Sequence, residues 1–258
     1  MPQHAFVLII DNAVHRFLFK PCWHWKTHLK DVDTMVVNLP SGRSAPPLDS
    51  FTHVILTGSE ASIVEPRPWF ETEARLIREL VERGIPILGS CFGHQMLVYA
   101  LSGPEYLQRS DPPEVGWAQI EMAESDPLFD ELPNPWSTFV YHFDEVVDPP
   151  APWQKLGRTR HCDTHVLRYG DRPVWGIQPH PEISSGKSRF FLCLTLLLGR
   201  KPLRHILRAL RDAPPRNETA DTVLRRFLAV SLQRPTVASA TSDRTRCETT
   251  AERLPREG

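Results

Sequence analysis

The sequence predicts an α/β fold with a mostly parallel central sheet flanked by helices, a smaller antiparallel β part and a C-terminal helical extension. Over the first hundred residues, short apolar runs alternate with helical patterns, as in parallel sheets that helices cover on both faces. After residue 102 the segments are short and alternating, with Pro- and Asp-rich turns between them, which is typical of antiparallel strands. Past residue 200, helical patterns followed by a polar tail predict the extension.

The parallel part should contain four buried strands, at residues 6–11, 34–39, 52–56 and 85–88. An amphipathic helix over residues 67–83 precedes the fourth strand. Its predicted core positions are Phe70, Ala74, Ile77 and Val81. Residues 13–30 carry a weaker helical pattern that Pro21 interrupts.

The later β segments are expected at residues 115–122, 137–143, 154–159, 163–169 and 173–178. A helix over 184–199 should follow the last of them. Its predicted inward-facing residues are Phe190, Phe191, Leu194, Leu197 and Leu198. Two shorter helices are expected at 202–211 and 219–232.

Charge divides the chain near residue 200. Residues 200–258 carry 13 Lys and Arg against 7 Asp and Glu, whereas residues 1–199 carry 17 against 24. We therefore expect a domain over 1–199, a helical extension over 200–233 and a disordered tail over 234–258. The basic residues are not interleaved with aromatic residues, which favours a solvated extension over a nucleic-acid-binding one.

Composition indicates a cytoplasmic protein without a cofactor. Five cysteines with irregular spacing do not form a disulfide framework, and we find no secretion signal and no apolar run long enough for a bilayer. There is no Gly-rich phosphate loop of the P-loop kind. Cys22, His24 and His28 are grouped, but no second cluster completes a four-ligand zinc site, so no metal is expected.

The strongest chemical signal is Gly89-Ser90-Cys91-Phe92-Gly93, between an apolar run and a helical pattern. Strand, tight turn and helix around one nucleophile form a nucleophile elbow, whose strained turn needs small neighbours. The positive end of the following helix lies beside the sulfur and favours the thiolate. The alternative, a buried structural cysteine, does not explain the two glycines.

A base for this nucleophile is found at His180. Pro181 holds His180 in an extended conformation, in which residues i and i+2 share a face. The carboxylate of Glu182 therefore lies on the side of the imidazole and can accept one ring proton, leaving the other nitrogen for Cys91.

These two motifs resemble those of the class I glutamine amidotransferases. The family pattern Gly-x-Cys-x-Gly-x-Gln occurs here as residues 89–95, and Gln-x-His-Pro-Glu as residues 178–182. By this resemblance Cys91 attacks the glutamine amide, His180 transfers protons and Glu182 orients His180. The resemblance also implies an oxyanion hole and substrate contacts. Their residues are the backbone amides of Gly58 and Phe92, then Gln95, Tyr141, His142 and Phe143.

Two departures from the family pattern bear on the substrate. Tyr141 and Phe143 stand where the family has Ser and Gly, which leaves the size and identity of the substrate open. Gly58-Ser59-Glu60 lacks the proline common at this turn, so the loop is expected to be looser.

Three functions remain open from the sequence. The first is release of ammonia from glutamine to a separate synthetase subunit, because residues 1–258 show no ATP-binding pattern. The second is a stand-alone hydrolase of γ-glutamyl peptides or conjugates that uses the same triad. The third is an inactive module that binds a partner through its extension. Glutamine or a γ-glutamyl compound is the expected ligand, and neither a membrane nor nucleic acid is expected as a partner.

Overall fold

The computed structural model describes residues 4–15, 20–197, 203–212 and 219–231. Its strands are β1 (Phe6–Asp11), β2 (Asp33–Asn38), β3 (His53–Leu56), β4 (Ile87–Ser90), β5 (Leu107–Met122), β6 (Trp136–Val146), β7 (Trp153–Arg158), β8 (Val166–Tyr169) and β9 (Val174–Ile177). Its α-helices are α1 (Pro21–Lys26), α2 (Phe70–Glu82), α3 (Phe92–Leu101), α4 (Ser185–Leu197), α5 (Leu203–Arg211) and α6 (Thr219–Leu228). Short 3-10 helices lie at Leu39–Ser41, Leu48–Ser50 and Pro104–Tyr106.

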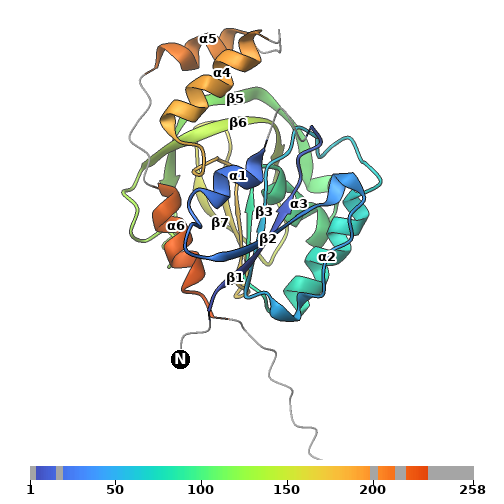
Figure 1. The fold of residues 1–258 in the computed structure, drawn as a ribbon. Helices are drawn as coiled ribbons and strands as arrows, with labels where there is room; N and C mark the ends of the chain where they lie inside the picture. The colour runs from blue at the N-terminus through green and yellow to red at the C-terminus, as the bar shows by residue number, and fades with distance from the viewer. Residues whose placement is uncertain (1–3, 16–19, 198–202, 213–218, 232–258) are drawn as a thin grey trace, which may run out of the picture.

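The described strands form one mixed sheet in the order β2-β1-β3-β4-β9-β8-β7-β5-β6 (Figure 1). The pairings from β2 to β9 are parallel, and those from β9 to β6 are antiparallel. The prediction of a mostly parallel sheet is therefore not confirmed. Apolar runs show where strands lie but not which strands pair, and β9 pairs directly with β4, which joins the antiparallel strands to the same sheet.

Helices cover both faces of the parallel strands. Leu8 and Ile10 of β1 point into a core that α2 and α3 complete, whereas Val7 and Ile9 point into a second core that α1 and α6 complete. These four β1 side chains are fully buried. The predicted core positions of α2 are all buried, as its helical periodicity required.

Helix α1 begins at the proline that was expected to interrupt it. Pro21 stands in the first turn of the helix, where its missing N–H costs no hydrogen bond. Cys22 and Trp25 then face the core. The pattern over 13–30 was therefore interpreted with the wrong boundary.

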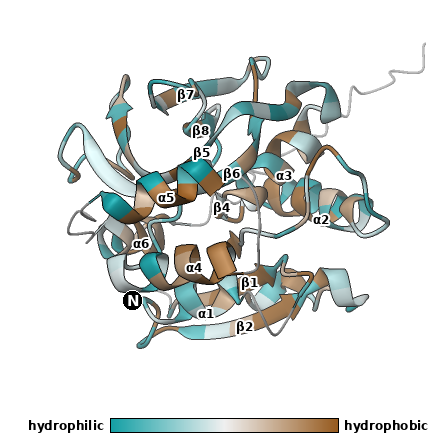
Figure 2. Ribbon diagram, turned by 90° about the horizontal axis from the view of Figure 1, so that it is seen from above, coloured by the Kyte–Doolittle hydropathy of each residue, from teal (hydrophilic) through white to brown (hydrophobic). Residues whose placement is uncertain are grey.

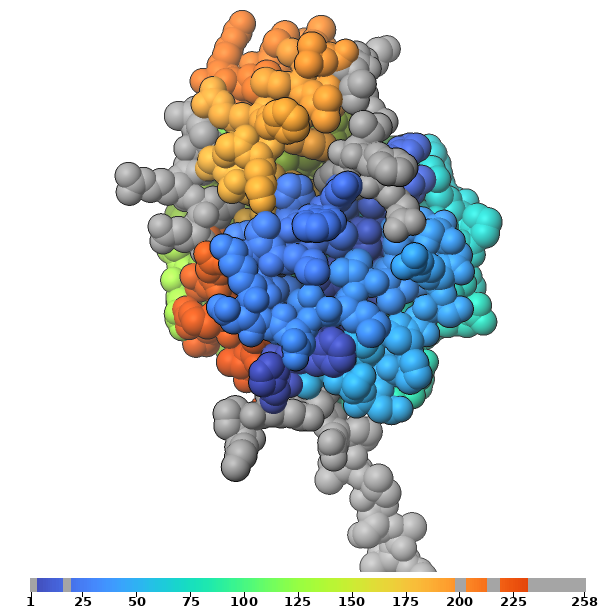
Figure 3. Space-filling model, in the orientation of Figure 1, coloured from blue at the N-terminus to red at the C-terminus, as the bar shows by residue number. Residues whose placement is uncertain are grey.

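Helices α4 and α5 lie over the β5–β6 hairpin, at the top of the molecule in Figures 1 and 3. Figure 2 shows that much of α4 is hydrophobic. Its buried residues are Ser188, Leu192 and Thr195, while Phe190 is 71% and Leu197 83% exposed. The prediction that Phe190 and Leu197 pack inward is wrong. The face of α4 that packs on the hairpin carries Ser188, Leu192 and Thr195 instead. Leu198 lies outside the described residues.

The two short helices expected after residue 200 are present as α5 and α6. Val223, Leu224 and Phe227 of α6 are buried in the core that α1 shares. Residues 234–258, expected to be disordered, lie outside the described residues. Within the described ranges, none of the helices combines the length and apolar character that a bilayer crossing requires.

Candidate functional site

Cys91 lies at the sharp turn between β4 and α3. Its φ of 52° and ψ of −107° are unfavourable for a residue with a Cβ, at a cost of about 1–3 kcal/mol. The Cys91 N–H donates to the Ile177 carbonyl at 2.8 Å, and the Gln95 N–H donates to the Cys91 carbonyl at 3.1 Å. Strand β9 and the first turn of α3 therefore hold the strained residue in place.

Gly93 explains why the turn needs a small residue after the nucleophile. A Cβ at Gly93 would lie 2.7 Å from the carbonyl carbon of Leu56, closer than real Cβ atoms approach backbone. Helix α3 thus begins in direct contact with the end of β3. This close approach places Cys91 above the edge where the parallel strands end.

His180 and Glu182 lie beside Cys91, although Cys91 and His180 are 89 positions apart along the chain. The His180 N–H donates to the Phe139 carbonyl at 2.8 Å, which fixes the extended segment after β9 against β6. His180 Nδ1 lies 2.8 Å from Glu182 Oε1, and the imidazole also hydrogen bonds with Cys91. Cys91, His180 and Glu182 are all buried. The structure brings the three predicted triad residues together.

Charge favours a protonated His180. Burial alone would lower the pKa of His180, but negative charge on Cys91 and on Glu182, with hydrogen bonds to both, raises the pKa to about 10. The arrangement therefore favours an imidazolium between two anions. A protonated imidazole beside a thiol favours the thiolate, which is the form that acts as a nucleophile.

Gly58 and Phe92 flank the reacting groups. A Cβ at Gly58 would lie 2.9 Å from His180 Cε1 and 3.7 Å from Cys91 Cβ, so the turn after β3 packs directly against both side chains. Phe92 is the first residue of α3. It lines a cavity that Cys91 and His180 also border. Amides in the first turn of a helix have no partner within the helix.

Side chains fix the loop after β3 in place of the missing proline. The Ser59 hydroxyl donates to the Asn12 carbonyl at 2.6 Å and accepts from the Ala61 N–H at 3.0 Å. Glu60 accepts from the Val14 N–H at 3.0 Å. The expectation of a looser loop therefore overlooked these hydrogen bonds, which tie the loop to the segment after β1.

The Gln95 side chain makes hydrogen bonds with other residues of the protein. Its Nε2 donates to the Asp144 carbonyl at 2.8 Å and to Gln178 Oε1 at 3.0 Å. Gln95 therefore joins α3 to the end of β6 and to the residue after β9. Gln95 also lines the cavity, and its contact with the substrate stays a prediction.

Tyr141 and Phe143 point to one side of β6, and the His142 side chain points to the other. The rings of Tyr141 and Phe143 pack edge to face, with their centroids 5.3 Å apart. Phe191 of α4 packs edge to face on Tyr141, with a centroid distance of 4.8 Å. These three residues form an aromatic wall of the cavity. The imidazole of His142 instead hydrogen bonds with Glu114.

The triad opens into a cavity of about 490 Å³. Part of its lining is polar: Arg109 Nη1 donates to Asp144 Oδ1 at 3.0 Å, and the Ser62 hydroxyl donates to Asp144 Oδ2 at 2.7 Å. Arg109 also pairs with Glu65. Our sequence interpretation did not place Arg109, Asp144 and Phe191 at the site, although Asp144 directly follows Phe143.

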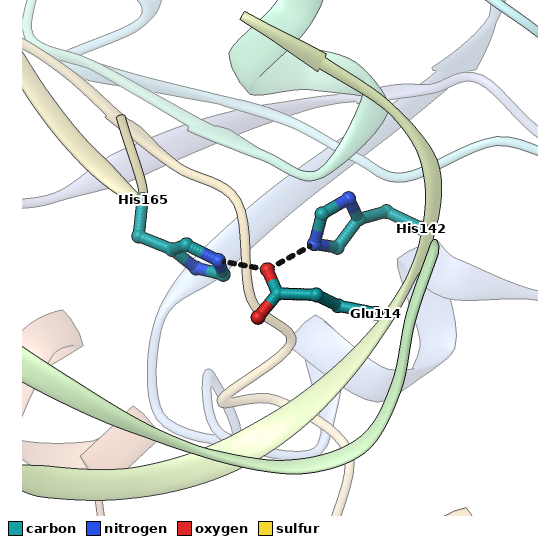
Figure 4. A group of neighbouring side chains, drawn as sticks. All are labelled: Glu114, His142 and His165. Atoms are coloured by element: carbon teal, nitrogen blue, oxygen red, sulfur yellow. Dashed lines mark hydrogen bonds and ion pairs between the residues drawn. The ribbon is translucent and has the colours of Figure 1, made fainter. Parts of the chain in front are cut away.

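A second polar cluster lies behind β6 (Figure 4). His142 Nε2 of β6 lies 3.1 Å and His165 Nε2 lies 2.6 Å from Glu114 Oε2 of β5. All three side chains are buried. Sequence reasoning missed the cluster because its members come from separate segments, and no local spacing links them. Among the described residues, Cys22, His24 and His28 are not a group whose ligand atoms lie together. His28 Nδ1 lies 2.7 Å from Asp221 Oδ1, and burial and Asp11 raise the pKa of the Cys22 thiol to about 12.

The fold and the site define an α/β protein with a cysteine, histidine and glutamate assembled at a nucleophile elbow. The model of the class I glutamine amidotransferase family matches residues 26–193. This chain belongs to that family, as the two motifs predicted.

Among the relatives is the glutamine-hydrolysing GMP synthase of Vibrio parahaemolyticus, 26% identical over 178 residues. The match covers 69% of this chain and 31% of that protein, so the chain spans about a third of the length of the curated relatives it matches. A glutamine amidotransferase from Thermotoga maritima has a TM-score of 0.69 at 21% identity, covering 88% of this chain and 100% of that chain. A glutamine amidotransferase from Methylobacillus flagellatus has a TM-score of 0.66 at 18% identity, with coverages of 91% and 97%. At these identities the solved structures support the fold.

Proposed function

We propose that this chain is a glutamine amidotransferase-type amidohydrolase that releases ammonia from the glutamine side chain through a γ-glutamyl thioester on Cys91. The observation that carries the proposal is the hydrogen-bonded series from Cys91 through His180 to Glu182, at the end of a cavity. Membership of the class I family supports the same reaction.

In the first half of the proposed reaction, the Cys91 thiolate attacks the side-chain carbonyl carbon of glutamine. The carbonyl oxygen becomes an oxyanion, for which the backbone N–H groups of Gly58 and Phe92 are the proposed donors. His180 then gives its proton to the amide nitrogen, the C–N bond breaks and ammonia leaves. Cys91 is left as the thioester.

In the second half, neutral His180 takes a proton from water, and the resulting hydroxide attacks the thioester carbonyl. Collapse of the second tetrahedral intermediate breaks the C–S bond, which releases glutamate and returns the sulfur as thiolate beside the imidazolium. Glu182 keeps the ring oriented in both halves through its bond to Nδ1.

The proposed partner is a separate synthetase subunit that uses the ammonia. The relatives carry the name of a glutamine-hydrolysing synthase, which supports a synthetase as the user of the ammonia. We propose residues 1–199 as the amidotransferase domain, with 200–233 as a helical extension of it.

One observation favours a second candidate, hydrolysis of a larger γ-glutamyl conjugate. The cavity of about 490 Å³ falls in the size range of pockets for drug-sized ligands, roughly 300–1,000 Å³. Its aromatic wall of Tyr141, Phe143 and Phe191 suits an apolar group beyond the γ-glutamyl unit.

The test uses the purified full chain with glutamine and, separately, with γ-glutamyl dipeptides. A diazoketone analogue of glutamine, followed by mass spectrometry, reports whether Cys91 is alkylated even where turnover needs a partner. Glu182→Gln should lower kcat by roughly 10²- to 10⁴-fold because the imidazole loses its orienting acceptor. Cys193→Ala, at an exposed cysteine, is the matched control and should keep full activity.

Ammonia from glutamine together with labelled Cys91 supports the first function. Cleavage of dipeptides without glutaminase activity supports the second. A chain that neither turns over these substrates nor is labelled at Cys91 contradicts both and leaves the inactive binding module.

A further inference from the structure

We propose that Glu114, His142 and His165 form a buried site for one divalent transition-metal ion, with zinc the best match to the ligands. The site is separate from the proposed triad and does not depend on the proposed function. Three side chains from β5, β6 and the segment before β8 converge on it (Figure 4).

The candidate ligand atoms already lie close together. His165 Nε2 lies 2.6 Å and His142 Nε2 3.1 Å from the same oxygen, Glu114 Oε2. The three ligand atoms all lie within 4.8 Å of one another. Zinc–nitrogen bonds of about 2.0–2.1 Å place the ligands of a tetrahedral site roughly 3.3 Å apart, so small side-chain movements suffice.

The hydrogen bond on the far side of His142 determines what its ring presents to Glu114. His142 Nδ1 lies 3.1 Å from the Asp144 carbonyl oxygen, which only accepts hydrogen bonds. Nδ1 therefore carries a proton, and in the neutral ring Nε2 presents a lone pair to Glu114 Oε2. A lone pair facing a buried carboxylate oxygen is unfavourable unless a cation lies between them. That cation is either a proton or a metal ion.

The hydrogen bonds to Glu114 and His142 resemble those that orient the ligands in known metal sites. The Thr159 hydroxyl donates to Glu114 Oε1 at 2.9 Å and fixes the carboxylate. A carbonyl bound to the far nitrogen of a ligating histidine is the usual arrangement that fixes its tautomer. Two imidazoles and one carboxylate suit zinc or iron(II), whereas calcium and magnesium prefer oxygen ligands only.

With three protein ligands, the proposed ion would need a water molecule as its fourth ligand. It would lie on the wall of the catalytic cavity. The Asp144 carbonyl that accepts from His142 also accepts from Gln95 Nε2 at 2.8 Å. Gln95 is bonded through its backbone to Cys91. Fixing His142 therefore fixes the end of β6 that carries Tyr141, Phe143 and Asp144 into the cavity.

The experiment measures metal binding by the full chain. The protein is purified, its metal content is determined by mass spectrometry, and the chelator-treated protein is titrated with Zn²⁺ and, as a spectroscopic probe, Co²⁺. The ligand variants are Glu114→Gln and His165→Gln. Thr159→Val tests the supporting hydrogen bond, and His161→Gln, at an exposed histidine of the same segment, is the matched control.

We expect one zinc per chain in the wild type and in His161→Gln, with a higher Tm in the presence of zinc. Glu114→Gln and His165→Gln should lose this binding, and Thr159→Val should bind zinc roughly 10- to 100-fold more weakly. Circular dichroism after chelation shows which variants fold. Where a ligand variant fails to fold, the Co²⁺ spectrum of the wild type and the Thr159→Val titration decide. Absence of zinc and Co²⁺ binding by the wild type, or equal binding by the folded ligand variants, overturns the proposal and leaves a proton-bridged network.

Discussion

His180 lies between two groups that carry negative charge. Burial would lower the pKa of the imidazole, but Cys91 and Glu182 raise it to about 10. This pKa lies above the ordinary value of 6.5. The contribution of protonated His180 to the stability of the folded protein is therefore fully present below pH 6.5, and it is lost as the pH rises through about 10. At neutral pH the free protein should therefore hold an imidazolium at this position.

We predict that Cys91→Ala lowers the pKa of His180, because one of the two anionic partners is removed. The measurement is an NMR titration of the His180 Cε1–H signal across the neutral and alkaline range, in the wild type and the variant. Cys193→Ala, which removes an exposed thiol instead, should leave the midpoint unchanged. Equal midpoints in the wild type and Cys91→Ala would show that the sulfur does not carry the charge assigned to it.

The residues that sequence alone located are those whose role follows from local geometry. Cys91 is marked by flanking glycines, and His180 with Glu182 by the proline between them. Arg109 and Phe191 could not be located in this way, because an arginine on a strand and a phenylalanine on a helix are common. They belong to the cavity only because β5 and α4 pack where they do. The Glu114 cluster was missed for the same reason.

At the scale of elements, the site depends on how closely α3 approaches the sheet. Gly93 contacts the end of β3 without a side chain between them. The strained backbone of Cys91 persists because its neighbours on both sides are fixed, by β9 before the helix and by the first turn of α3 after it. The elbow is therefore determined by packing as much as by the turn itself.

We predict that Gly93→Ala destabilises the protein by about 1–3 kcal/mol, the usual cost of overpacking a filled core. The added Cβ meets backbone at Leu56, which cannot rotate away as a side chain could. Urea unfolding followed by circular dichroism measures the change. Gly186→Ala is the matched control, since a Cβ there has open space, and it should leave the midpoint unchanged or slightly raised. An unchanged midpoint for Gly93→Ala would contradict the close approach.

Most helices and strands were predictable because each has its own periodicity. Which face of a helix is buried and which strands pair were harder to predict. The α2 core positions follow from one apolar stripe, and all are buried. Helix α4 is apolar nearly all round, so its sequence does not identify one buried face, and Phe190 was assigned to the wrong side. Strand pairing was likewise undetermined, and this explains why the parallel share of the sheet was overestimated.

For the whole molecule, α6 links the C-terminal part of the chain to the sheet and to the site. Phe227 packs edge to face against His53 at 5.0 Å and against Trp175 at 6.4 Å. Asp221 of α6 lies 2.7 Å from His28 Nδ1, and His28 Nε2 lies 3.3 Å from the Glu182 carbonyl. A charge break near residue 200 predicted a separate extension, yet these contacts make α6 part of the cover of one sheet face.

We therefore predict that Phe227→Ala lowers the free energy of unfolding of the whole protein by about 3–5 kcal/mol, as for a phenylalanine in a filled core. Thermal unfolding, followed both by circular dichroism and by the fluorescence of buried tryptophans, should show one transition at a lower temperature with each probe. Arg225→Ala on the exposed side of α6, where the guanidinium pairs with Glu131, should change the transition little. If α6 were an independent appendage, Phe227→Ala would leave the main transition unchanged. The two variants alter opposite faces of the same helix, so they separate loss of core packing from loss of the helix itself.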